Sequence, residues 1–282
     1  MPEKNQSFYD VLTAAISEFA DTGFVSAERL AYWQEALKRA AEATMGPIHD
    51  MDEMLRRSMR ALYARLVEQN GILRYHPGVA RWTIQKLKPQ LHLELDKRIL
   101  ASADLIKLNR SQSIAQTLRR FSGWSTSIPA GGAAEADKAK IKAEIRKPLA
   151  RLPFEERRVL TDQGHKFIAG LNDIVATDSG AIAAGWISHF RQANYDYRED
   201  HKERDSEFLK RSGKPSLYAI RDSWAIKAGL INKGAGYTDE MTQPAEECFC
   251  RCAYRYFYAL RSLPDSMLTA KGRAELARTK VA

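Results

Sequence analysis

The sequence lacks several features that would place the protein in a familiar class. No apolar run reaches about 18 residues, the length that a membrane-spanning helix needs, so we expect no membrane partner. The opening MPEKNQSFYDVL lacks the basic segment and apolar core of a secretory leader. The 16 glycines form neither a P-loop nor the GxGxxG pattern of dinucleotide-binding folds. With 44% apolar and 28% charged residues, the 282-residue chain has the composition of a globular protein.

Cysteine is scarce, and its distribution is uneven. The chain has three cysteines, Cys248, Cys250 and Cys252, spaced two residues apart. On an extended strand this spacing points all three thiols to one face. An odd number of cysteines indicates reduced thiols and an intracellular protein. We therefore expect free, partly buried thiols and no cofactor.

Two alternatives for the thiols stay open. A zinc site would need four ligands, and His201 with Cys248, Cys250 and Cys252 could supply them, although structural zinc sites usually show C-x2-C pairs. A cysteine nucleophile would need a histidine base and a third group that orients the base. The candidate bases are His165, His189 and His201. None of them stands in a recognisable catalytic motif.

The net charge of +9, from 44 basic and 35 acidic residues, mildly favours anionic partners. From Phe249 onward there are seven basic residues against two acidic ones. A solvated basic tail is one interpretation of this bias, and contact with nucleic acid is the other. The candidate nucleic-acid contacts are Arg251, Arg255, Arg261, Lys271 and Arg273.

Apolar periodicity predicts a mainly α protein. Residues 8–70 show repeated three- and four-residue spacing of apolar side chains, and residues 82–120 predict a long helix that is kinked or broken at Pro89. The small residues of 122–136 predict a linker. We therefore expect a helical domain over 1–121, the linker, and a second domain over 137–282. That second domain begins with helices that stop near Pro148 and restart at Pro153, and it ends in a small α+β unit. Its predicted strands are at 216–220 and 249–260, and its closing helix at 264–280.

Two segments of the second domain together resemble a known family. Arg198, His201 and Asp205 fit the pattern R-x-x-H-x-x-x-D, and about 45 residues later comes Cys250-Arg251-Cys252. In order and spacing this pair resembles the C-terminal signature of phage head-morphogenesis proteins, the Mu F-like minor capsid family. The match covers roughly residues 155–262.

The match has departures. Ser206 stands where the family usually has Gly. Glu247, Cys248 and Phe249 stand where it usually has His, Pro and Asn, so one potential metal ligand is replaced.

The resemblance implies a minor structural protein of a phage or prophage virion. Such a protein would be made in the host cytoplasm, would bind portal or capsid proteins during head morphogenesis, and could contact packaged DNA. It implies no catalytic residues, and the polar residues of the two segments would brace the α+β unit. These residues are Arg198, His201, Asp205, Cys250, Arg251 and Cys252.

Two alternatives to this function stay open. The first is a metal-dependent hydrolase or nuclease that uses His201, Asp205 and the cysteines. The second is a DNA-binding accessory protein.

Overall fold

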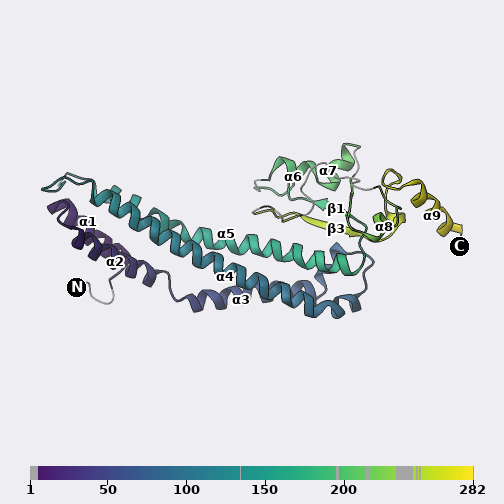
Figure 1. Ribbon diagram of the computed structural model, residues 1–282, viewed down its shortest axis with the longest axis horizontal. Coiled ribbons are helices and arrows are strands. Elements are labelled where there is room, and N and C mark those ends of the chain that lie inside the picture. The colour runs from purple at the N-terminus through teal and green to yellow at the C-terminus, as the bar shows by residue number, and fades with distance from the viewer. Residues whose placement is uncertain are drawn as a thin grey trace. The chain divides into compact units, whose positions relative to one another are not determined.

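The computed structural model describes residues 6–133, 135–194, 197–213, 216–232, 244, 245, 247 and 249–281, without the side chains of Ile48, Lys280 and Val281. The prediction of a mainly α protein with a small α+β part is confirmed (Figure 1). No helix in the described ranges is long and apolar enough to span a membrane. The chain packs into two compact units. The first unit is Met1–Arg56 with Ala101–Leu160, and the second is Arg57–Leu100 with Thr161–Ala282.

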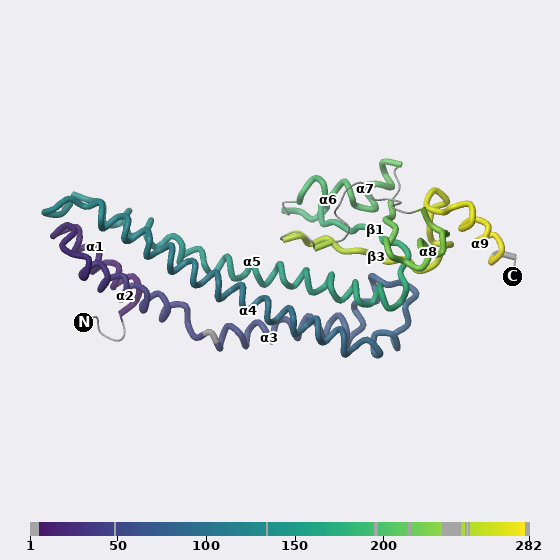
Figure 2. Tube along the Cα trace, in the orientation of Figure 1, coloured from purple at the N-terminus to yellow at the C-terminus, as the bar shows by residue number. Residues whose placement is uncertain are grey.

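Two long helices, α4 (Arg81–Ser125) and α5 (Lys138–Asp178), contribute to both units (Figure 2). Both helices continue through their prolines. The helix α4 therefore does not break at Pro89, and the predicted stop of α5 between Pro148 and Pro153 is wrong. Pro89 is exposed, so the carbonyl that loses its hydrogen bond lies on the solvent side of the helix.

In the first unit, α1 (Phe8–Thr22) and α2 (Ala27–Thr44) pack against the far part of α4 and the start of α5. The apolar face predicted for α1 is buried, and Ser26 caps α2 by accepting the Arg29 backbone N–H at 3.2 Å. The turn after α4, within the predicted linker, is also part of this core. Its Ile128 is buried, and the Ala133 N–H donates to the Ala20 carbonyl at 2.7 Å. The observed division of units therefore differs from the predicted boundary at 122–136, because the small residues there permit close backbone contact rather than separation.

The helical part of the second unit begins at the end of α3 (Ile48–Tyr63) and continues through a π-turn at Ala64–Glu68 and a 3-10 turn at Gly71–Tyr75 into α4. Apolar residues of these elements and of the far end of α5 form one core. Buried His76 ties this core to the sheet. Its imidazole stacks on Tyr256, Nε2 lies 2.9 Å from Asn172 Oδ1, and Nδ1 lies 2.5 Å from the Tyr258 hydroxyl. Burial lowers the pKa of His76 to about 4, so the imidazole is neutral and accepts from Tyr258.

The sheet has three antiparallel strands in the order β2-β1-β3. The strands are β1 (Ala183–Ile187), β2 (Tyr218–Ala219) and β3 (Ala253–Phe257), and β2 and β3 lie within the predicted segments. The sequence did not predict β1, because its alanines and glycine carry little strand propensity. Small residues suit this central strand, since a Cβ on Gly185 would come within 2.6 Å of Ser206 Oγ.

Short helices surround the sheet: α6 (Glu199–Glu203), α7 (Ser206–Arg211) and α8 (Trp224–Lys227). After β3, two 3-10 turns at Leu260–Ser262 and Asp265–Met267 lead to α9 (Ala270–Val281). The closing helix therefore starts later than predicted.

Candidate metal centre

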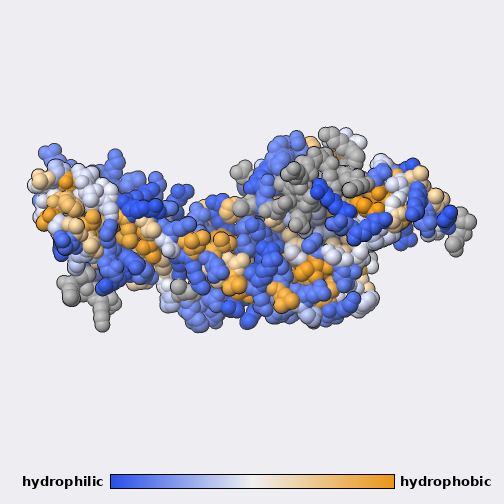
Figure 3. Space-filling model, in the orientation of Figure 1, coloured by the Kyte–Doolittle hydropathy of each residue, from blue (hydrophilic) through white to orange (hydrophobic). Residues whose placement is uncertain are grey.

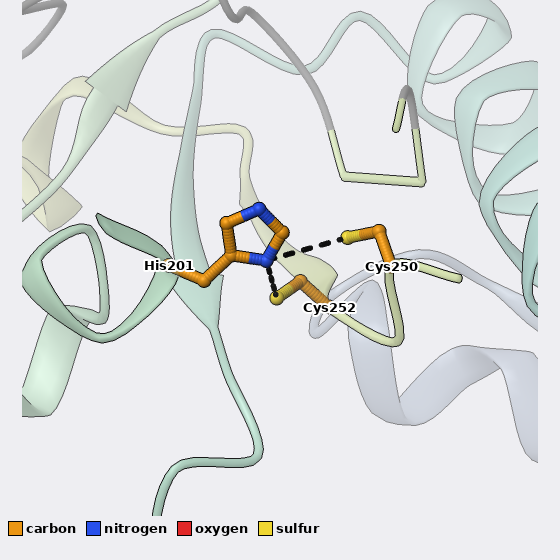
Figure 4. A group of neighbouring side chains, drawn as sticks. All are labelled: His201, Cys250 and Cys252. Atoms are coloured by element: carbon orange, nitrogen blue, oxygen red, sulfur yellow. Dashed lines mark hydrogen bonds between the residues drawn. The ribbon is translucent and has the colours of Figure 1, made fainter. Parts of the chain in front are cut away.

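His201 and two of the three cysteines converge inside the second unit (Figure 4). His201 lies on α6, and Cys250 and Cys252 lie just before β3, 49 and 51 residues further along the chain. The His201 imidazole packs edge-on against Trp186 of β1, with ring centroids 5.8 Å apart. The side chains are 5%, 3% and 6% exposed for His201, Cys250 and Cys252, so the cluster is closed to solvent.

Both nitrogen–sulfur distances in this cluster are close to those of a tetrahedral zinc site. His201 Nδ1 lies 3.3 Å from Cys252 Sγ and 3.7 Å from Cys250 Sγ. Zinc bonds of about 2.0 Å to nitrogen and 2.3 Å to sulfur place tetrahedral N and S ligands about 3.6 Å apart. The three atoms can therefore coordinate one ion with little rearrangement.

The opposite side of the imidazole has a carboxylate partner. Glu247 Oε2 lies 3.3 Å from His201 Nε2, and Glu247 also forms an ion pair with Arg198. A carboxylate at Nε2 favours the tautomer that carries its proton there. The Nδ1 lone pair then points toward the thiols. Glu247 thus orients the His201 imidazole without being one of the three candidate ligands.

The two sulfur atoms are not equivalent. The Ala245 backbone N–H donates to Cys250 Sγ at 3.3 Å. Hydrogen bonding from Cys252 lowers the pKa of Cys250, and the same contact together with burial raises the pKa of Cys252. The backbone donor at Cys250 therefore favours the first negative charge of the pair on that sulfur. A cation beside both sulfurs would favour the second ionisation as well.

Asp205 has a different role from the one that the hydrolase alternative requires. Its buried carboxylate caps α7, accepting the backbone N–H groups of Glu207 at 2.9 Å and Phe208 at 3.3 Å. It also accepts the Ser188 N–H at 2.7 Å, just beyond β1. Asp205 therefore fixes the helix that follows His201 against the sheet, and its carboxylate is engaged by backbone donors.

One positioning residue carries no signal in the sequence. Asp162 of α5 is buried and accepts the Phe249 backbone N–H at 2.6 Å, with Lys166 Nζ 3.3 Å away. Phe249 has a left-handed backbone with φ of 62°, which turns the chain into Cys250. The loop that carries the cysteines is thereby held to α5, 87 residues earlier in the chain.

The remaining predicted ligand, Cys248, lies outside the described residues. Glu247 departs from the family pattern in the sequence, and in the structure it lies against the imidazole of His201. Nothing in its spacing indicated that contact.

The predicted nucleic-acid contacts are divided among different roles. Lys271 Nζ donates to the Ala228 carbonyl at 2.8 Å, and Arg273 donates to the Leu268 carbonyl at 2.8 Å. These two residues therefore brace α9. Arg255 and Arg261 are exposed, and Arg251 is half-buried beside the cysteines.

Comparison of the chain with family models, curated proteins and solved structures gives no match. The chemistry of the site therefore rests on its own geometry. A nitrogen and two sulfurs, buried together and oriented by a carboxylate, form a donor set suited to Zn²⁺.

Proposed function

We propose that this chain is a minor head-morphogenesis protein of a phage or prophage, which acts by binding portal or capsid proteins, and that one structural zinc ion holds its C-terminal unit together. The zinc part rests on the convergence of His201 Nδ1 with the sulfurs of Cys250 and Cys252, and the head-protein part rests on the family resemblance. Zinc would be held by these three residues and would tie α6 to the start of β3. The chemistry that it supplies is coordination alone.

The contacts between the two motif segments support the family resemblance. Arg198 and His201, from the first segment, both contact Glu247, which lies three residues before Cys250 of the second segment. The segments therefore form one physical junction. A junction of this kind braces a small domain and gives it a fixed surface for docking.

Burial favours a structural centre over a catalytic one. The same atoms could be arranged as a Cys–His–carboxylate triad, with Cys250 as nucleophile, His201 as base and Glu247 as the orienting group. A nucleophile must reach its substrate, yet the Cys250 side chain is 3% exposed and its sulfur already accepts a backbone N–H. Nucleophilic catalysis is therefore the weaker interpretation.

Metal analysis and thiol labelling of the purified full-length chain separate these roles. We expect one zinc per chain, and slow alkylation of Cys250 and Cys252 by iodoacetamide that becomes fast after chelation. A nucleophilic cysteine would instead be alkylated equally fast at neutral pH before and after chelation, and a His201→Ala change would abolish that reactivity. A metal-dependent hydrolase would lose activity with its zinc, whereas a structural centre has no activity to lose.

The assembly role needs a separate test. Particles purified from the phage or induced prophage that encodes the chain should contain it at low copy number, and deletion of the chain should lower the yield of filled heads. Absence from particles together with a normal yield would refute the head-protein role and leave the zinc site untouched. Retention on DNA that falls steeply with salt would instead favour the accessory DNA-binding role.

A further inference from the structure

The outer face of α4 in the second unit carries a straight stripe of exposed apolar side chains. Trp82, Leu93 and Leu100 are 67%, 70% and 63% exposed, and exposed Pro89 lies between them. Offsets of 7, 11 and 18 residues from Trp82 equal about 1.9, 3.1 and 5.0 helical turns, so all four lie on one line along the helix. The stripe is about 27 Å long.

This stripe is distinct from the core face of the same helix segment. The core face is fully buried in the unit and consists of Ile84, Leu87, Leu91, Leu95 and Ile99. A helix that is apolar on both faces is typical of one that is covered on both sides. Hydrophobic residues also appear among hydrophilic ones on the molecular surface in view (Figure 3). Three large apolar side chains in one line, each about two-thirds exposed, indicate a contact surface.

The polar residues within the stripe indicate which partner fits it. Lys86 and Asp96 lie between the apolar positions, with side chains 62% and 60% exposed. The pattern is symmetric about position 91. Trp82 and Leu100 are equally far from this centre, as are Pro89 and Leu93, and so are Lys86 and Asp96.

We propose that a second copy of this chain packs antiparallel across this stripe about a two-fold axis. In that arrangement each Trp82 meets Leu100 of the other copy, each Pro89 meets Leu93, and each Lys86 meets Asp96. Apolar residues pair with apolar ones, and each charge meets its opposite. Such self-complementarity is what an isologous interface requires. A parallel pairing in register would place like charges together instead.

The size of the stripe determines how strongly the two copies are expected to associate. A footprint of about 27 Å by the roughly 10 Å width of a helix is smaller than the roughly 800 Å² per partner of a standard stable interface. We therefore expect a dimer that dissociates on dilution through the micromolar range. The flanking Lys97 is paired with Glu94 of its own chain at 3.3 Å, which limits repulsion between copies at the edge of the contact.

Leu93 provides the first test, by analytical ultracentrifugation of the full chain between 1 and about 100 μM. Because Leu93 occurs twice in the dimer, the Leu93→Lys variant should weaken association by more than roughly a hundredfold. The side chain is exposed in the single chain, so folding should not change. Leu108→Lys, at an exposed position of α4 off this stripe, is the matched control and should leave association intact.

Charge reversal tests the register. Lys86→Asp places four carboxylates at the interface and Asp96→Lys places four ammonium groups there, so each variant alone should associate roughly tenfold more weakly. An equimolar mixture should form the heterodimer, because each reversed charge again meets its opposite. A chain that stays monomeric at 100 μM would overturn the proposal, as would a dimer that is insensitive to Leu93→Lys or a mixture that fails to associate. These outcomes are independent of zinc and of the head-assembly role.

Discussion

Replacing Cys252 by serine tests the metal centre directly, because Cys252 Sγ lies nearest to His201 Nδ1 among the two sulfurs. A ligand that binds only the folded state stabilises it by about 2.7 kcal/mol at 100 times its Kd and by about 4.1 kcal/mol at 1,000 times. Removing one of three protein ligands should remove this stabilisation. For a unit of this size each kcal/mol shifts the Tm by about 2–4 °C, so we expect a zinc-dependent fall of roughly 5–16 °C.

The measurement is differential scanning calorimetry of wild type and Cys252→Ser, each with zinc and with chelator. In the presence of chelator, the free energies of unfolding of the two proteins should differ by only about 1–2 kcal/mol, the ordinary cost of changing a buried side chain. The zinc-dependent part should appear in wild type alone. His49→Ala, at an exposed histidine of the first unit, is the control and should retain the full zinc response. A wild-type Tm that does not change when chelator is added, together with no zinc in the purified protein, would refute the zinc centre.

Three further outcomes follow from the contacts of the second unit. Glu247→Gln should weaken zinc binding by roughly 10- to 100-fold while keeping one zinc per chain, as competition with a chromogenic chelator will show; unchanged affinity would mean that Glu247 does not orient His201. The pKa of His76 is about 4 in the folded chain against 6.5 as its ordinary value, so the unfolded chain binds the extra proton first. The contribution of His76 to the free energy of unfolding should then be complete above about pH 6.5, and the free energy should fall by up to about 3 kcal/mol toward pH 4. Urea titrations of His76→Gln should show a flatter dependence of the free energy of unfolding on pH. Asp205→Ala should cost about 2–4 kcal/mol in urea unfolding, since it removes a helix cap and a buried charge-assisted hydrogen bond; a loss below about 0.5 kcal/mol would contradict that role.

The sequence predicted most of the helical architecture because apolar spacing repeats clearly there. It failed at features set by contacts between distant segments. The strand β1 reads as a small-residue packing segment, and only its two neighbours make it a strand. The helices α4 and α5 continue through prolines that local rules treat as boundaries, because tertiary packing of the surrounding turns outweighs the loss of single hydrogen bonds.

The candidate site was predicted in part. The sequence identified His201, Cys250 and Cys252 as potential ligands, and the structure brings these three together. The contacts of Glu247 and Asp162 could not be predicted, since they join positions 46 and 87 residues apart with no motif to mark them. Asp205 has the residue type of a ligand, yet its position immediately before α7 makes it a cap. Residue type indicated the chemistry, and topology assigned the roles.

The order of the sheet has a consequence during synthesis. The central strand β1 pairs with β3, which begins 66 residues after β1 ends, while the earlier partner β2 has only two residues. At about 5–20 residues per second, a ribosome needs roughly 3–13 s to supply the missing strand. For that interval the nascent chain carries an unpaired apolar strand edge, which is a substrate for chaperones and a site of aggregation. A transcript that stops before codon 253 would leave the edge open permanently, and the product should be removed by quality control.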